Sequence, residues 1–524
     1  MKVRTALVKI AAVSPFQPLK SLADFFLTER CFRGIFALLI TLMVLNSLSR
    51  TVADLDLWGY LAFGRLFWQS GRFPYQDVFA YVPTRSLWVY HEWLTGVLFY
   101  PLYQAWGAPC LQLLKFALGG AAVQLIYLTA RRRGAGFFSA LAGLMVLPPF
   151  LAFGFSPVRA QVFTYFFFAL SLFVLESVRL SGRFRGLLLL ILIQVPWCNL
   201  HGGFLAGLGL LALYAAGEAC QRRPFWPYLA AFLAAGLVTL INPYGLDYWI
   251  YLYRAVAMPR PEITEWASVP LAWQKGIFRI TIIMFTALAV FTILLAWLTA
   301  WREAAPGLIL LVTLVMGLKH CRHQVFFALA AGVYLPLLLE RFAQKRWGAG
   351  GIPLPQGRAR QIAILVVAWC CLLGLGWQAL QKNPLTLELP ETPANPKVPF
   401  SYPLSAVEYI RQHQLSGKIL NEFNWGEFLI WSLYPACRVA MDGRYETVYG
   451  DDIFGLYVDF IQGRPGWRKF LELYPPDLIL VSPGSKVYPL LLAEPQWQQV
   501  QESAGAALFR PQKATSDFPE VNWR

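Results

Sequence analysis

Long apolar runs follow one another through the first 380 residues of the chain, and short arginine-rich segments separate them. A helix needs about 20 apolar residues to cross a membrane, and fewer when it is tilted or buried among other helices. With 57% hydrophobic and only 14% charged residues among 524, the chain has more apolar surface than a soluble core of this size needs. The runs predict an all-α polytopic membrane bundle over residues 1–380.

Eleven runs qualify as transmembrane helices, and the arginine clusters between them indicate on which side each loop lies, because cytoplasmic loops are basic. The runs are 34–50, 108–130, 135–154, 158–178, 186–200, 203–219, 226–242, 279–300, 306–319, 324–340 and 361–380. With the N-terminus inside, the clusters at 131–133, 179–185, 222–223, 302 and 341–360 all fall on the cytoplasmic side. The C-terminus then lies outside, which places the C-terminal domain on the outer face of the membrane; with the resemblance described below, this implies a bacterial inner-membrane protein whose C-terminal domain is periplasmic.

One further stretch, residues 88–106, is apolar enough to cross but does not fit this topology. Counting it as a span would place the triple arginine at 131–133 outside. We therefore expect a juxtamembrane or re-entrant helix packed on the outer face, within a first outer loop at 51–107.

Composition changes beyond Lys382. Prolines are frequent up to residue 400, so residues 381–400 are expected to form an extended linker. The sequence after it predicts helices at 403–414, 426–433 and 467–473 that alternate with strands at 418–423, 438–441 and 477–481. Such alternation is typical of an α/β fold, and we expect a soluble α/β domain over residues 401–524.

Charge and motifs narrow the functional class. The net charge is +16, but the basic residues cluster between apolar runs, so membrane lipids and not nucleic acids are the expected surroundings. The eight cysteines form no CxxC pattern, and they suggest neither a zinc site nor a disulfide framework. The sequence also contains no P-loop, GxGxxG motif or nucleophile elbow, so a nucleotide-sugar donor has no visible cradle.

The predicted topology gathers polar residues from distant parts of the sequence at the outer face. Carboxylates at the boundary between a membrane helix and water usually bind a ligand or react, because Lys, Arg, Trp and Tyr serve better as membrane anchors. The set comprises Asp54, Asp56, His91, Glu92, Arg159, Gln161, Asn199, His201, Asn242, Glu265, Lys319, His320, Arg322 and His323.

The two signs of charge suggest two tasks. Carboxylates can take a proton from a hydroxyl nucleophile or hold a divalent cation, so Asp54, Asp56 and Glu92 are catalytic candidates. Asp54 and Asp56 are also candidate ligands of Mg²⁺ or Mn²⁺. Cations at a membrane surface suit a phosphate, and the candidates are Arg159, Lys319, His320, Arg322 and His323. The candidates for substrate contacts are His91, Gln161, Asn199, His201, Asn242 and Glu265, with Asp442 and Arg444 of the C-terminal domain.

Each candidate also has a structural alternative. Asp54 and Asp56 suit the N-cap of a helix, and Glu92 suits a simple ion pair. Arg159 and the quartet Lys319–His323 suit a surface anchor. His201 beside two glycines suits a hydrogen-bonded turn, and Asp442-Gly443-Arg444 suits a tight turn with a solvated ion pair.

Several motifs carry a resemblance to a known family. Asp54-Leu55-Asp56-Leu57-Trp58, Gly71-Arg72-Phe73-Pro74 and His91-Glu92-Trp93-Leu94 resemble the first outer loop of bacterial GT-C superfamily glycosyltransferases. Asn199-Leu200-His201-Gly202, Asn242-Pro243-Tyr244-Gly245 and Met441-Asp442-Gly443-Arg444 are similar to elements of members with the same layout. The resemblance implies a polyprenyl-phosphate-sugar donor, an acidic catalytic residue in the first outer loop, and a membrane bundle with a soluble outer domain.

The chain departs from the better-known branches of that superfamily. It lacks the Trp-Trp-Asp signature of oligosaccharyltransferases and the paired prolines of protein mannosyltransferases. We expect an inverting transferase that uses a lipid-linked donor and a glycan, lipid or protein acceptor. An envelope polysaccharide ligase or polymerase, a transporter or flippase, and a non-enzymatic scaffold remain the alternatives.

Overall fold

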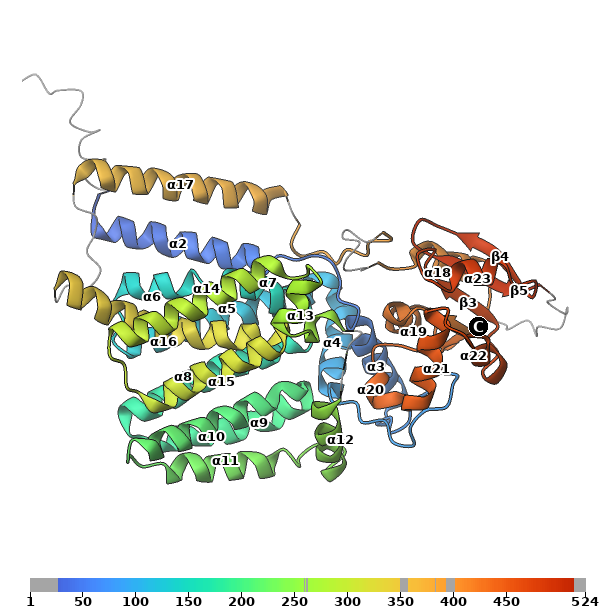
Figure 1. Ribbon diagram of the computed structural model, residues 1–524, viewed down its shortest axis with the longest axis horizontal. Helices are drawn as coiled ribbons and strands as arrows, with labels where there is room; N and C mark the ends of the chain where they lie inside the picture. The colour runs from blue at the N-terminus through green and yellow to red at the C-terminus, as the bar shows by residue number, and fades with distance from the viewer. Residues whose placement is uncertain are drawn as a thin grey trace, which may run out of the picture.

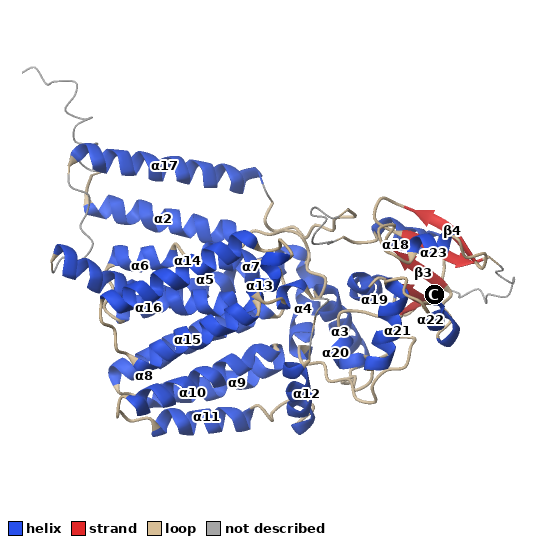
Figure 2. Ribbon diagram, in the orientation of Figure 1, coloured by secondary structure: helices blue, strands red, loops and turns tan. Residues whose placement is uncertain are grey.

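The computed structural model describes residues 27–258, 260, 263–348, 357–381, 383–392 and 401–512. The long helices lie side by side, and a small sheet lies beyond one end of this bundle (Figures 1 and 2). Two helices, α3 (Leu57–Ser70) and α4 (Trp93–Trp106), run across that end, between the bundle and the sheet (Figure 1). The expected fold class, a helical membrane bundle with a C-terminal α/β region, is confirmed.

Eight helices of the described chain are long and apolar enough to cross a membrane, so this is a multi-pass membrane protein. They are α2 (Glu29–Ser47), α5 (Ala108–Arg132), α6 with α7 (Phe137–Gly154), α8 (Gln161–Ser181), α10 with the turn before it (Gly202–Cys220), α14 (Arg279–Leu298), α16 with the turn before it (Cys321–Trp347) and α17 (Arg358–Gln381). The remaining predicted runs form shorter apolar helices, α9 (Leu187–Leu200) with the turn before it, α11 (Trp226–Val238) and α15 (Ala304–Lys319).

Burial distinguishes the centre of the bundle from its edge. In the apolar window of Cys321–Trp347, 78% of the residues are buried, whereas the figure for α17 is 17%. α16 is therefore the central helix, and α17, which packs on α2, presents most of its apolar surface outward as lipid requires. Small residues allow close approach elsewhere: a Cβ on Gly217 of α10 would overlap the backbone of Ala305 in α15.

The stretch 88–106 yields the helix α4, preceded by an irregular segment that ends at Glu92. α4 packs against α3, a helix that the sequence did not predict, and Gly64 and Gly96 let the two backbones touch. Asp56 and Glu92 are the residues directly before α3 and α4. The two helices thus begin beside each other, and each brings one carboxyl to the same place.

The C-terminal region contains a five-stranded sheet with the order β2-β1-β3-β5-β4. β1 (Gly417–Asn421) pairs in parallel with β2 (Cys437–Val439) and with β3 (Leu478–Val481), and β5 (Ala507–Pro511) is antiparallel to β3 and to β4 (Trp497–Glu502). The helices around it are α18 (Leu404–Gln412), α19 (Gly426–Leu433), α20 (Tyr445–Val448), α21 (Asp451–Ile461), α22 (Arg468–Leu473) and α23 (Tyr488–Leu492). β4 and β5 were not predicted, because the polar run in β4 lacks a clear alternation.

The first outer loop and the linker join the sheet domain to the bundle. Ala80 pairs with Val439 of β2, and Thr84 pairs with Tyr449. Within the predicted linker, Glu388 exchanges backbone hydrogen bonds with Thr51 and Ala53, so this part of the linker is an ordered edge of the loop. Residues 382 and 393–400 of the predicted linker lie outside the described residues.

Candidate functional site

A cavity of about 840 Å³ lies between the ends of the long helices, the first outer loop and the C-terminal domain. The residues that line it come from all three regions, which are far apart in the sequence. Most predicted site residues are among them: Asp54, Asp56, His91, Glu92, Arg159, Gln161, His201, Glu265, Lys319, His320, Arg322, His323 and Arg444. Carboxylates and cations therefore share one enclosure.

Asp54 and Asp56 take different positions at the start of α3. The Asp54 Oδ1 accepts a hydrogen bond from the Asp56 backbone N–H at 3.2 Å, and its Oδ2 lies 3.7 Å from an Arg159 nitrogen. The Asp56 side chain occupies the N-cap position but makes no capping hydrogen bond, so the N-cap alternative does not describe it. Burial raises the pKa of Asp56 to about 8, and the neighbouring Asp54 charge adds to the shift.

Glu92 faces two histidines and the Tyr60 hydroxyl, and among the described residues it forms no ion pair with an arginine. Its Oε1 lies 3.4 Å from the His201 Nε2 and 3.7 Å from the His91 Nε2. The Gly203 backbone N–H donates to the His201 Nδ1 at 2.9 Å, which leaves the ring proton on Nε2, pointing toward Glu92. Burial raises the pKa of Glu92 to about 7. His201 is thus both part of a hydrogen-bonded turn and a neighbour of a site carboxyl.

The opposite wall of the cavity is cationic. Glu265 lies 2.9 Å from Arg159 and 3.1 Å from Arg322, and these two guanidinium groups lower its pKa to about 2 although burial acts in the other direction. Arg322 also lies over the Trp266 ring, 4.8 Å from the ring centre. Lys319 ends α15 and is exposed, with no ion pair among the described residues. Glu265, predicted as a substrate contact, is here the partner of both arginines.

Three predicted residues lie outside the cavity lining. The Asn199 amide donates to the Val195 and Ile241 carbonyls and accepts from the Trp93 indole. The Asn242 side chain holds its own turn by bonding to Thr239 and Tyr244. Their polar atoms are used within the protein, which fits a structural role.

Asp442 is the third residue outside the lining, and its ion pair with Arg444 is buried, not solvated as the alternative reading expected. The Asp442 carboxylate accepts from the Arg444 guanidinium at 2.7 and 2.8 Å and from the Tyr449 hydroxyl at 2.6 Å. Arg444 also lies 2.6 Å from Asp77 of the first outer loop. This pair fastens the C-terminal domain to the loop.

Sequence reasoning missed several cavity residues. Glu427 enters from α19, and Arg260 pairs with Glu446 at 2.5 Å in the cavity lining. A single carboxylate inside the apolar helix Gly426–Leu433 was the available signal for Glu427. Three lining side chains carry buried atoms without a hydrogen-bond partner in the described part of the chain: the Arg159 Nε, the Gln161 Oε1 and the His323 Nδ1. Such atoms are costly unless a ligand or water bonds to them.

The predicted divalent-cation site does not fit the donor set. Among the described residues no group of three or more His, Cys, Asp or Glu side chains is arranged to hold a metal ion. Asp54 already faces the positive charge of Arg159, and Mg²⁺ demands several oxygen ligands at short range. We therefore derive no step through a metal.

No protein-family model and no curated relative matches this sequence. Among solved structures, the chain is similar to the Archaeoglobus fulgidus oligosaccharyltransferase tethered to an acceptor peptide, with a TM-score of 0.50 and 13% identity over 88% of this chain and 70% of that one. It is also similar to the arabinofuranosyltransferase AftD from Mycobacteria, with a TM-score of 0.52 and 13% identity over 91% of this chain but 40% of that one. Both neighbours are GT-C membrane glycosyltransferases, so the predicted GT-C fold is confirmed.

Proposed function

We propose that this GT-C-fold protein is an inner-membrane glycosyltransferase that moves a sugar from a polyprenyl-phosphate donor to an acceptor hydroxyl at the periplasmic face. One observation carries the proposal: Asp56 and Glu92, which form no ion pair with an arginine or lysine among the described residues, face the same cavity as Arg159 and Arg322. Glycosyl transfer needs a base at the acceptor and positive charge at the departing phosphate. The cavity lies at the ends of membrane-spanning helices, a position suited to a donor whose lipid tail stays in the bilayer.

Asp56 is the base in this scheme, because Asp54 is held by Arg159 and by the backbone of its own turn. The acceptor oxygen attacks the anomeric carbon and forms the glycosidic bond, while the bond from that carbon to the phosphate oxygen breaks. The electron pair leaves with the phosphate, and the acceptor proton passes to Asp56. A single displacement of this kind inverts the configuration at the anomeric carbon.

Arg159 and Arg322 receive the phosphate. Glu265 holds both guanidinium groups toward the cavity, so their positions are set before the donor binds. The Arg159 Nε is buried and has no hydrogen-bond partner in the described structure. Its N–H can donate a hydrogen bond to a phosphate oxygen. Lys319 and His323 add donors at the end of α15 and in the turn after it.

The test is transfer from a defined polyprenyl-phosphate sugar by purified variants. Asp56→Ala should lose about 10²- to 10⁴-fold in rate, the range that a general base contributes. Asp54→Ala should lose less of the transfer rate. Asp451→Ala is the matched control, because the Asp451 side chain is 91% exposed. Full activity of the Asp56 variant would remove the assignment.

A further inference from the structure

The C-terminal domain turns the carboxyl ends of its parallel strands toward the cavity. Phe423 and Asn424 follow β1, Gly443 and Arg444 follow β2, and all four line the cavity. In open α/β sheets this edge is where ligands bind, because loops and helix N-termini meet there. The domain therefore presents its ligand-binding edge to the membrane site.

Glu427 is a carboxyl that this edge brings into the cavity lining. It lies in the first turn of α19, and its Oε2 accepts a hydrogen bond from the Gly59 backbone N–H of α3 at 3.0 Å. A Cβ on Gly443 would lie 2.7 Å from the Glu427 Oε1 and 3.5 Å from the Asp56 Oδ1. The Glu427 and Asp56 carboxyls thus border the same point, which only a glycine leaves open.

No cation neutralises Glu427 among the described residues. The guanidinium whose charge acts on Glu427, that of Arg444, is engaged by Asp442 and Asp77. The Glu427 Oε1 also has no hydrogen-bond partner in the described part of the chain, although the residue is only 6% exposed. A buried carboxyl oxygen that lines a cavity without a partner is suited to accept a hydrogen bond from a ligand hydroxyl.

We propose that Glu427 binds a second hydroxyl of the acceptor, next to the hydroxyl that reacts at Asp56, so that the acceptor is a sugar and not a serine, threonine or simple alcohol. The inference rests on the proposed function, because it takes Asp56 as the base. A sugar ring offers neighbouring hydroxyls to the two carboxyls, whereas a threonine side chain offers one. Asn424, exposed beside Glu427, supplies an amide for a further hydroxyl.

Acceptor binding without donor tests this directly, because it does not depend on transfer. The full chain in nanodiscs is titrated with methyl glycosides of glucose, galactose, mannose and arabinofuranose, each with its single-deoxy analogues, and with N-acetyl-threonine amide. Binding is followed by saturation-transfer-difference NMR. At least one glycoside should bind, and loss of one hydroxyl should weaken its binding about tenfold or more, because the carboxyl oxygen is then left without a hydrogen-bond partner.

The variants assign that hydroxyl to Glu427. Glu427→Ala should bind the parent glycoside and the sensitive deoxy analogue equally, and Glu427→Gln should restore part of the discrimination. Gly443→Ala fills the space between the Glu427 and Asp56 carboxyls. It should weaken binding of the parent glycoside although Glu427 itself is unaltered. Glu422→Ala is the matched control, because Glu422 follows the same strand but bonds to the Ser482 backbone and does not line the cavity.

Binding of the threonine amide alone, binding of no glycoside, or unchanged discrimination in Glu427→Ala would each overturn the inference. The proposed function fails differently: glycosides would bind with the expected discrimination, but the protein would not transfer a sugar from a polyprenyl-phosphate donor.

Discussion

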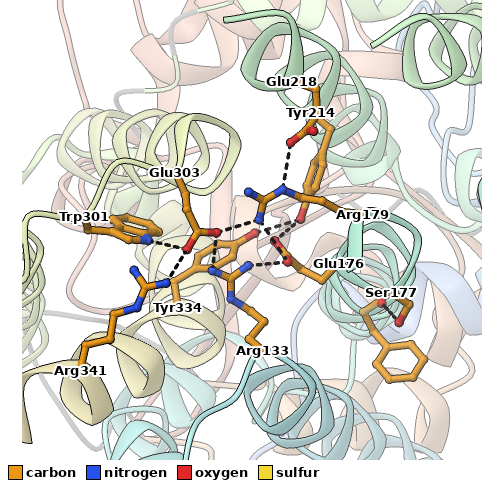
Figure 3. A network of polar contacts seen from close by, with 11 residues as sticks. Arg133, Glu176, Ser177, Arg179, Tyr214, Glu218, Trp301, Glu303, Tyr334 and Arg341 are labelled. Carbon is orange, nitrogen blue, oxygen red and sulfur yellow. Dashed lines mark hydrogen bonds and ion pairs between the residues drawn. The ribbon is translucent and has the colours of Figure 1, made fainter. Parts of the chain in front are cut away.

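Two clusters of buried charge lie at opposite ends of the same helices, and they are built differently. α8 begins at the cavity with Gln161 and ends near Arg179, while α15 begins beside Glu303 and ends at the cavity with Lys319. At the end away from the cavity, carboxylates and arginines form one network (Figure 3). Its ion pairs join Arg133, Glu176, Arg179, Glu218, Glu303 and Arg341.

The difference lies in how the carboxylates are partnered. Glu303 lies 2.7 Å from Arg179 and 2.9 Å from Arg133, and these arginines lower its pKa to about 2 against the effect of burial. In the cavity, burial raises the pKa of Asp56 to about 8 and that of Glu92 to about 7, although Arg159 acts in the other direction on both carboxyls and Arg322 does so on Glu92. Among the described residues neither carboxyl forms an ion pair with an arginine. A saturated network stabilises the fold, whereas unpartnered carboxyls cost stability and are available for chemistry.

The largest effect is expected from breaking the saturated network. Glu303→Ala leaves Arg133 and Arg179 with fewer partners, and should lower the free energy of unfolding by about 3 kcal/mol. The transfer rate of the remaining folded protein should stay near that of the wild type. Because the folded-state pKa of Glu303 is depressed, its contribution is present above pH 4.5 and is lost as the pH falls toward 2. Thermal unfolding in detergent at several pH values measures the loss of stability and its pH dependence, and a transfer assay measures the rate. A loss of rate in Glu303→Ala as large as its loss of stability would show that the network also contributes to transfer.

Arg322→Ala should affect the donor more than the acceptor. The removed group faces the proposed phosphate site, so KM for the donor should rise about tenfold or more while KM for the acceptor changes little. Arg254→Ala, an exposed arginine outside the cavity lining, is the control. An unchanged donor KM would count against the cationic wall as a phosphate site.

The rate of transfer should rise with pH up to about pH 8. The base must be ionised, and Asp56 ionises with a pKa raised to about 8, so each pH unit below that value should cost about a factor of ten. In Asp56→Asn the residual rate should lose this dependence. A pH profile from 5 to 9 with both proteins decides the point, and an identical slope in the variant would assign the titration to another group.

The smallest effect is expected at the exposed rim of the network. Arg341 lies 3.4 Å from Glu303 and its side chain is 43% exposed, so solvent screens the pair. Arg341→Ala should change the free energy of unfolding by about 0.5 kcal/mol or less. A loss as large as that of Glu303→Ala would show that the rim, and not the buried centre, stabilises the bundle.

The membrane helices could be predicted because their signal is local. Each helix satisfies its own backbone hydrogen bonds, so an apolar run of sufficient length is enough to indicate it. β4 escaped prediction because its stability comes from pairing with β5 and not from an apolar alternation of its own. α3 was not predicted because it is too short to cross a membrane and lies across one end of the bundle. Its apolar face is buried by α4 and α19, two contacts that the local sequence does not indicate.

The site was predictable only in part for a similar reason. Arg159, Lys319 and His323 stand at the ends of predicted helices, and topology alone brings helix ends together. Glu427 reaches the cavity because α19 docks on Gly59 of α3, a contact between residues far apart in the sequence that no local pattern encodes. Asn199 and Asn242 carry the same chemistry as ligand-binding amides, but their partners are backbone groups of neighbouring turns.

The most direct test measures transfer rate and thermal unfolding on the same preparations of Asp56→Asn and Glu303→Gln. The account predicts opposite results: Asp56→Asn keeps or gains stability while its rate falls about 10²-fold or more, and Glu303→Gln loses stability while its folded fraction transfers normally. Equal loss of rate and stability in both variants, or full activity of Asp56→Asn, would contradict the division between a cluster that reacts and a cluster that holds the bundle together.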